Sequence, residues 1–188
     1  MQMIMSDFLR PKSNIGKLEF LIRSFTWGLP CTVGGLIIAF GMLLTGHRPR
    51  RFGCCIQFEI GRNWGGGSLG ICMFTCKNAS FRLKAHEHGH SIQNCFYGPL
   101  MPLLVNIPSS TRYLYRKIIK QIFPKLKIPP YDSAWFEAEA TKLGVEFMNN
   151  FSEIDFSHRL CSGIQSTLPH YVISFSNFQR QRSRFHRH

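Results

Sequence analysis

The chain has 188 residues, 44% of them hydrophobic, and its 23 Lys and Arg against 10 Asp and Glu give a formal net charge of +13. This size suits one modest domain with an added anchor, and the charge predicts an anionic partner surface; no nucleic-acid-binding module is recognisable, which favours phospholipid over nucleic acid. Seven cysteines, an odd number without the spacing of a small disulfide-bonded scaffold, exclude that class and agree with a reducing compartment.

The first part of the chain is predicted to hold a membrane anchor. After a basic segment (1–24), residues 26–46 carry no charge and are long enough to cross a bilayer as one helix. The run starts late and ends in HRPRR, which argues against a cleaved secretory signal, whereas a buried core helix is the alternative. The Arg cluster directly after the run favours a single-pass protein whose remaining domain faces the cytoplasm, as at a bacterial inner membrane.

Two short stretches after the anchor, residues 56–60 and 69–73, alternate apolar side chains with polar or small ones. The sequence GRNWGGG between them is rich in turn residues and lacks the pattern of a phosphate-binding loop. This arrangement predicts a β-hairpin with its turn at the glycines. Residues 68–75 would form an edge strand that either completes the sheet or pairs with an extended substrate.

The sequence KAHEHGHSIQ contains an HExxH motif formed by His86, Glu87 and His90. In a helix over about residues 81–96, positions i and i+4 lie on one face, so both imidazoles can bind one zinc ion while Glu87 reaches the water on that ion. Glu87 is also the only carboxylate between residues 60 and 131. An acid this isolated in a basic stretch indicates a specific role.

Three other residues bear on the same helix. His88 points about 200° away from His86, so we expect it to pack or to face solvent rather than to bind the metal. Asn78 or Ser80 is expected to cap the helix at its start.

Two further segments precede the third candidate ligand. Residues 96–107 are apolar but are too short to span a bilayer and contain two prolines, so they either pack in the core near the metal or dip into the membrane. Residues 111–127 place apolar and basic side chains at helical spacing. They predict a basic amphipathic helix, which lies on an anionic membrane or is an ordinary surface helix.

A zinc site with two histidines needs a third protein ligand that leaves one position open for water. The sequence DSAWFEAEATKLGVEF repeats apolar residues at helical spacing, with Asp132 or Ser133 as a cap. Glu137 and Glu139 lie about 200° apart on this helix, so at most one faces the metal. We expect Glu137, because the small Ala140 one turn on allows a close approach of the two helices; Glu139 is expected to be solvated.

HEHGH followed later by ExxAT resembles the gluzincin metallopeptidases, especially the HtpX-like membrane gluzincins, whose second motif reads ExxAD. Small bacterial proteins with HEYGH or HEHGH after an apolar segment are similar in style. The resemblance implies zinc bound by His86, His90 and Glu137, with Glu87 as the general base. Thr141 replaces the Asp that supports a ligand histidine in the family, and Asp132 is a candidate substitute.

The sequence therefore predicts an α+β fold with a transmembrane helix at residues 25–46. A small zincin-like metallopeptidase domain follows at residues 47–150, built from the hairpin, the HExxH helix and the glutamate helix. Residues 151–188 are polar, basic and aperiodic, and are expected to form a disordered tail.

The function predicted from these features is a membrane-anchored zinc peptidase acting on a peptide or protein. Zinc would lower the pKa of its bound water, Glu87 would take the proton, and Tyr131, Tyr113 or Tyr115 would stabilise the oxyanion. The alternative is a non-catalytic protein that binds anionic lipid through residues 111–127 and holds a structural or vestigial metal site. Substrate specificity and oligomeric state do not follow from the sequence.

Overall fold

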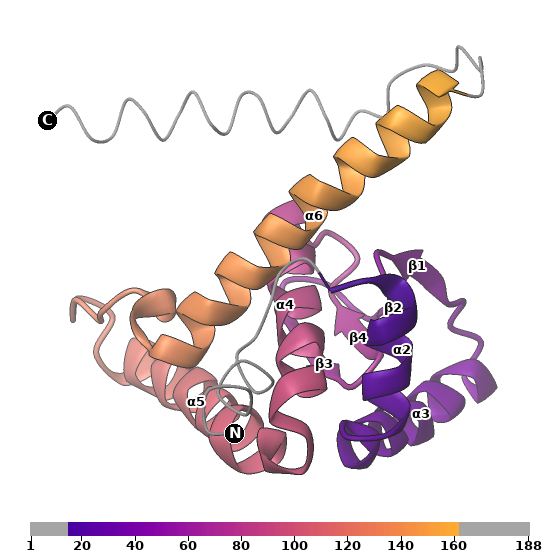
Figure 1. The fold of residues 1–188 in the computed structure, drawn as a ribbon. Helices are drawn as coiled ribbons and strands as arrows, with labels where there is room; N and C mark the ends of the chain where they lie inside the picture. Colours follow the sequence, from indigo (N-terminus) through magenta and orange to yellow (C-terminus); the bar gives the residue numbers. More distant parts are fainter. Residues whose placement is uncertain (1–14, 162–188) are drawn as a thin grey trace, which may run out of the picture. The chain divides into compact units, whose positions relative to one another are not determined.

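The computed structural model describes residues 15–161, and it describes side chains as far as residue 150. This part of the chain has five α-helices and one four-stranded mixed sheet, which confirms the α+β class (Figure 1). The elements are, in chain order, α2 (Lys17–Phe25), α3 (Leu29–Leu44), β1 (Arg50–Phe52), β2 (Cys55–Glu59), β3 (Gly66–Leu69), β4 (Cys72–Thr75), α4 (Phe81–Tyr97), η1 (Gly98–Leu100), η2 (Pro102–Asn106), α5 (Ile107–Ile122), η3 (Tyr131–Ser133) and α6 (Trp135–Cys161).

The chain divides into two compact units, residues 1–148 and 149–188. All the packing described below belongs to the first unit. Helix α6 continues to Cys161, so residues 151–161 of the expected tail are helical. The rest of that tail lies outside the described residues.

Within the uncharged run of residues 26–46, residues 29–44 form one helix, α3, of only 16 residues. Helices α2 and α3 are bent by 92° at residues 26–28. Gly28 is buried there against Asn94, whose side-chain amide donates to the Gly28 carbonyl over 3.2 Å. Within the described residues no single helix has both the length and the apolar character to cross a bilayer, and only the bent pair taken together meets those two criteria.

Helix α3 packs one face onto the sheet. Its buried residues are Cys31, Thr32, Gly35 and Ala39, which recur at helical spacing. A Cβ at Gly35 would collide with the Leu69 carbonyl oxygen, so only glycine allows the helix this close to the end of β3. The segment predicted as an anchor is therefore attached to the sheet along one side.

The strand pairing differs from the predicted hairpin. The sheet order is β1-β2-β4-β3, with β2 parallel to β4 and with antiparallel pairs at β1-β2 and β3-β4. The tight turns lie at Gly53 and Gly70, both with φ of +57°. Gly66 and Gly67 belong to strand β3 rather than to a turn. The chain thus makes two hairpins side by side, and the edge strands are β1 and β3, so residues 68–75 do not form one edge strand.

Helix α4 carries the HExxH motif and lies between the sheet and the first turns of α6 (Figure 1). It begins after Ser80, whose hydroxyl accepts a hydrogen bond from the Leu83 N–H, so Ser80 is the cap. His88 is fully buried on the sheet side, where it stacks between Phe20 and Phe147 and accepts a hydrogen bond from the Cys54 N–H. The expectation that His88 packs is confirmed.

The segment that follows α4 packs in part against the core. Met101 and Val105 are buried in a small cluster with Cys31 and Phe136. Core packing is therefore correct for these two side chains. Their apolar neighbours along the same segment are exposed instead: Leu100, Leu103, Leu104 and Ile107.

Candidate metal centre

The metal centre depends on how closely α4 and α6 approach each other. A Cβ at Gly89 would collide with the Ala140 carbonyl oxygen, and a Cβ at Gly144 would collide with the Ala85 carbonyl oxygen. Each helix thus presents one Ala and one Gly, four residues apart, to the backbone of the other. The small Ala140 was expected to allow this approach, and Gly89 and Gly144 complete it.

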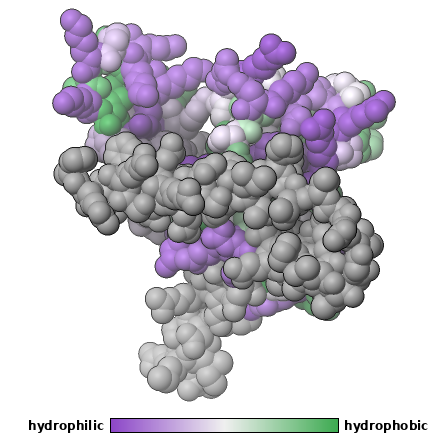
Figure 2. Space-filling model, turned by 90° about the horizontal axis from the view of Figure 1, so that it is seen from above, coloured by the Kyte–Doolittle hydropathy of each residue, from purple (hydrophilic) through white to green (hydrophobic). Residues whose placement is uncertain are grey.

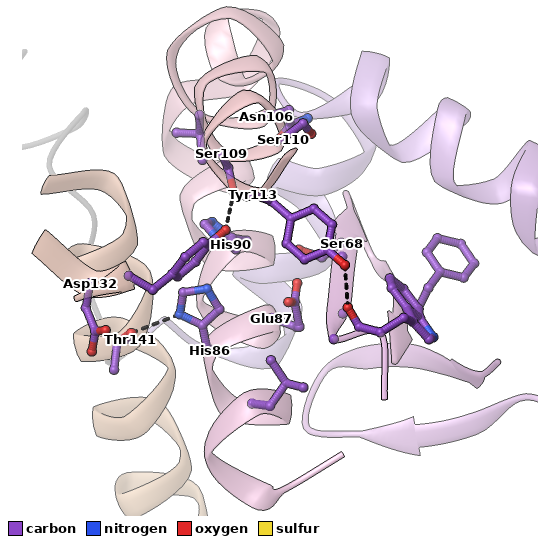
Figure 3. A pocket seen from close by; sticks show the side chains of 18 of the residues that line it. Ser68, His86, Glu87, His90, Asn106, Ser109, Ser110, Tyr113, Asp132 and Thr141 are labelled. Atoms are coloured by element: carbon purple, nitrogen blue, oxygen red, sulfur yellow. Dashed lines mark hydrogen bonds between the residues drawn. The ribbon is translucent and has the colours of Figure 1, made fainter. Parts of the chain in front are cut away.

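The crossing brings the three predicted ligands together. One Glu137 carboxylate oxygen, Oε2, lies 3.1 Å from His86 Nε2 and 3.2 Å from His90 Nε2. All three ligand atoms lie within 4.8 Å of one another, so the cluster can hold a metal ion. Glu137 is fully buried, and Figure 3 shows His86 projecting from α4 toward the cavity.

The other ring nitrogen of each histidine is held from outside the cluster. His86 Nδ1 lies 2.8 Å from the Thr141 hydroxyl (Figure 3), and His90 Nδ1 lies 2.7 Å from Gln93 Oε1. Both Nε2 atoms are therefore directed to Glu137 and to the metal position. Thr141 thus contacts His86 with a hydroxyl, at the position where the ExxAD pattern has a carboxylate.

Gln93 fixes the tautomer of His90. Its amide nitrogen donates to the Phe136 carbonyl over 2.9 Å and to a Glu139 carboxylate oxygen over 2.7 Å. The amide oxygen must therefore face His90 Nδ1 and accept from it, which leaves Nε2 with a free lone pair. Gln93 itself is fully buried.

Glu139 is not the solvated residue that its helical position suggested. It is only partly exposed, and its carboxylate accepts hydrogen bonds from Gln93 and from the Tyr97 hydroxyl, the latter over 2.6 Å. The sequence reasoning missed both Gln93 and Tyr97. Gln93 could have been found from its place one turn after His90 on the same helix face.

Glu87 lies under strand β3 and is 4% exposed. A Cβ at Gly66 would be 2.7 Å from Glu87 Oε1, so the glycine in β3 makes room for this carboxylate. Glu87 Oε2 is buried and has no hydrogen-bond partner among the described residues. Burial raises the pKa of Glu87 above its ordinary value, and His90 and His86 offset this only in part.

Electrostatics in the cluster favour a cation. Burial would raise the pKa of Glu137, but hydrogen bonds with His86 and His90 hold it well below its ordinary value. Burial would likewise lower the pKa of His90, but the hydrogen bond to Glu137 and the negative charge of Glu87 raise it. The buried Glu137 carboxylate thus stabilises positive charge at this position.

The cluster opens into a cavity of about 860 Å³ between β3, α4, α5 and α6 (Figure 3). Tyr113 and Tyr131 line this cavity, but Tyr115 does not. The Tyr113 hydroxyl donates to the Trp64 carbonyl over 2.9 Å. The Tyr131 hydroxyl lies 3.2 Å from Ser109 Oγ, and its ring centroid is 6.2 Å from that of His86. Burial raises the pKa of Tyr131 to about 12, so its phenol stays protonated.

The two predicted caps of the glutamate helix have other partners. Asp132 forms an ion pair with Arg82 over 2.9 Å, and the Ser133 hydroxyl accepts from Arg112 over 2.6 Å. Asp132 lines the outer part of the cavity but contacts neither ligand histidine. The expectation that Asp132 substitutes for the Asp of the ExxAD pattern is therefore not met, because Asp132 pairs with Arg82.

The donor set fits a zinc ion. Ligand atoms about 2.0–2.2 Å from a tetrahedral zinc lie about 3.3 Å from one another, close to the two distances from Glu137 to the imidazoles. Two nitrogens and one carboxylate leave a fourth position open, as at catalytic zinc sites.

The chain matches no protein-family model, no curated protein and no solved structure.

Proposed function

We propose that the protein is a membrane-associated, zinc-dependent peptidase with a zincin-like domain. The observation that carries this proposal is the convergence of His86, His90 and Glu137 beside a buried Glu87, with a cavity in front of them. A site that only stabilised the fold would be expected to have four protein ligands and no such cavity.

Different residues of the chain have different roles in the proposed reaction. Zinc, when bound, lowers the pKa of a coordinated water and polarises a carbonyl group. Glu87 accepts a proton from the attacking water and returns it to the leaving amine; its buried position and raised pKa suit that task. Tyr131 is the best donor to the oxyanion, because the Tyr113 proton is already bonded to a carbonyl.

Strand β3 is well placed to hold a substrate. It is one of the two edge strands of the sheet, and its residues 66–69 line the cavity directly beside Glu87. An extended peptide that pairs with its free edge would bring a peptide bond toward the metal position. Hydrophobic side chains at the wall, Trp64, Leu69, Phe74, Leu83 and Val105, favour apolar substrate side chains.

Replacing the base tests the catalytic proposal. Glu87→Gln should keep one zinc per chain and lower the hydrolysis of unfolded casein by at least about a hundredfold, because general-base catalysis is lost. The matched control is Glu19→Gln, which removes an exposed carboxylate paired with Arg23 and should leave hydrolysis unchanged. Equal hydrolysis by the wild type and the Glu87 variant would contradict the assignment.

The association with a membrane is a second part of the proposal. It rests on residues 26–46 and on the amphipathic residues 111–127, most of whose apolar side chains are exposed. The location that this basic sequence favours is the cytoplasmic face of a bacterial inner membrane, with the catalytic domain in the cytoplasm.

A non-catalytic lipid-binding protein is the second candidate function. Helix α5 favours it, because none of its residues is buried although the helix carries four apolar side chains with more than 40% exposure: Ile107, Leu114, Ile118 and Ile122. This candidate predicts vesicle binding and bound zinc without hydrolysis by the wild type. The casein assay therefore separates the two functions.

A further inference from the structure

Helix α3 has two apolar faces, and only one of them is covered. The covered face contacts β3 and β4 through Thr32, Gly35 and Ala39. The opposite face exposes large side chains, with Ile37 at 68%, Phe40 at 62% and Leu44 at 73% exposure. Several large apolar side chains exposed together on one face of a folded domain indicate a binding surface.

This face continues onto the segment after α4. Asn106 donates to Cys31 Sγ over 3.5 Å, and Val105 packs beside Cys31, so η2 lies along the first turns of α3. The outer side of η1, η2 and α5 is again apolar and exposed: Leu100, Leu103, Leu104, Ile107, Leu114, Ile118 and Ile122. Helices α3 and α5 both lie along the lower side of the first unit in Figure 1. The face seen from above in Figure 2 is mostly hydrophilic where described residues are visible.

The geometry of α3 is unsuited to crossing a bilayer. Its 16 residues extend about 24 Å, less than the roughly 30 Å of hydrocarbon in a bilayer. Its inner face contacts the backbone of the β3-β4 turn at Leu69 and Gly70, and Gly28 at its start contacts Asn94. Lipid can therefore cover only the outer side of the helix.

The charges beside this surface suit anionic headgroups. Four lysines in and after α5 are exposed: Lys117, Lys120, Lys125 and Lys127. No carboxylate occurs between Glu87 and Asp132, so this part of the chain carries only positive charge. Apolar side chains flanked by lysines are typical of helices that lie in the interface of a membrane.

We propose that the outer face of α3 with η1, η2 and α5 forms one surface that enters a single leaflet of an anionic bilayer, so that α3 lies along the membrane and does not cross it. The inference rests on the proposed membrane association but not on the peptidase activity. It has a consequence for substrate access, because Asn106 and Ser109 of the same segment line the cavity. The cavity would then lie next to the headgroups.

Vesicle binding by the full chain tests the surface. The wild type should bind vesicles of phosphatidylglycerol and phosphatidylcholine, and Ile37→Asp should lower the partition coefficient about tenfold or more. The matched control is Leu18→Asp, because Leu18 is an exposed leucine in the first turn of α2, outside the proposed surface. Circular dichroism of both variants shows whether they fold, and Phe40→Asp serves in place of a variant that does not.

Thiol labelling tests the orientation of α3. Lys17→Cys and Arg48→Cys place a thiol before and after the bent helix pair, and the wild type gives the background from the native cysteines. An impermeant maleimide added outside vesicle-bound protein should label both positions completely. Protection of either position would show a crossing helix and overturn the proposal while leaving the membrane association intact. If the wild type binds no vesicles, or if Leu18→Asp weakens binding as much as Ile37→Asp, the surface itself is wrong.

Discussion

The α4–α6 crossing and the outer surface of α3, η2 and α5 differ in how they are packed: glycines make close backbone contacts at the crossing, whereas large apolar side chains are exposed on the outer surface. At the crossing, Gly89 and Gly144 bring two backbones into contact, and buried polar groups such as Gln93 and Glu137 have partners. On α3, glycine occurs as well, but Ile37 and Phe40 point outward and are mostly exposed. Close helix packing through glycine therefore positions metal-binding side chains only where polar residues lie beside the glycines.

The largest effect is expected when one glycine in each region is replaced by alanine and the two variants are compared. Gly144→Ala should separate the ligand helices, because its Cβ would collide with the Ala85 carbonyl, and should destabilise the fold by about 3 kcal/mol. The zinc content should fall well below one per chain, as measured by atomic absorption. Gly41→Ala is the control: nothing lies within 4 Å of its Cβ, so it should be neutral or stabilise α3 by up to about 1 kcal/mol. Similar stability and zinc content in the two variants would show that the two regions do not differ in their need for glycine.

Removal of the Gln93 amide should weaken zinc binding without removing a ligand. Gln93→Leu deletes the acceptor of His90 Nδ1 and leaves the Glu139 carboxylate with one donor fewer. The zinc affinity should fall about 10–100-fold in competition with a chromophoric chelator. The control, Gln121→Leu on the exposed α5, should bind zinc as the wild type does. Unchanged affinity in the Gln93 variant would mean that His90 is oriented by other contacts.

Acid should destabilise the region of α4 through His88. Burial lowers the pKa of His88 to about 3 from an ordinary 6.5, so the unfolded chain takes up the proton first. Stability is therefore lost as the pH falls from 6.5 toward 3, by about 1.4 kcal/mol per pH unit well below 6.5. Urea unfolding of the metal-free chain at pH 8 and pH 5 measures this loss. His88→Phe should lower stability at pH 8, where the Cys54 N–H loses its partner, but should flatten the pH dependence. A variant with the same acid sensitivity as the wild type would assign the effect to other groups.

The smallest effect is expected at the outer edge of the cavity. Asp132→Asn breaks an exposed ion pair with Arg82, which should cost less than about 1 kcal/mol and leave zinc affinity unchanged. Thr141→Val removes the hydroxyl beside His86 and should weaken zinc binding about tenfold. If zinc titrations showed weaker binding by the Asp132 variant than by the Thr141 variant, Asp132 would be the residue that supports the ligand histidine.

The parts of the site that follow from helical periodicity could be predicted from the sequence. The spacing of His86 and His90 predicts the helix and the shared face, and Ser80 is one of the two caps expected for its start. Glu137 was distinguished from Glu139 by the small residue one turn later. These predictions succeed because a single helix determines each of them.

The rest depended on partners far away in the sequence. Alternation in β2 and β4 indicates which side chains face the core, but it does not reveal that the two strands pair in parallel. Glu139 was predicted to be solvated because its helical phase points away from Glu137, yet Gln93 and Tyr97 reach it from α4. The uncharged run does not reveal that one side of α3 is covered, because the close approach of Gly35 to the Leu69 carbonyl depends on a strand far away in the sequence.

The crossing of α4 and α6 also bears on how an ion is acquired. The glycine contacts and the Gln93 hydrogen bonds join the two helices through groups that are not metal ligands. Zinc fingers, by contrast, unfold when they lose their ion. Chelation should accordingly strip this chain without melting it, and reloading should be governed by diffusion of the cation through the opening beside Tyr131 rather than by refolding.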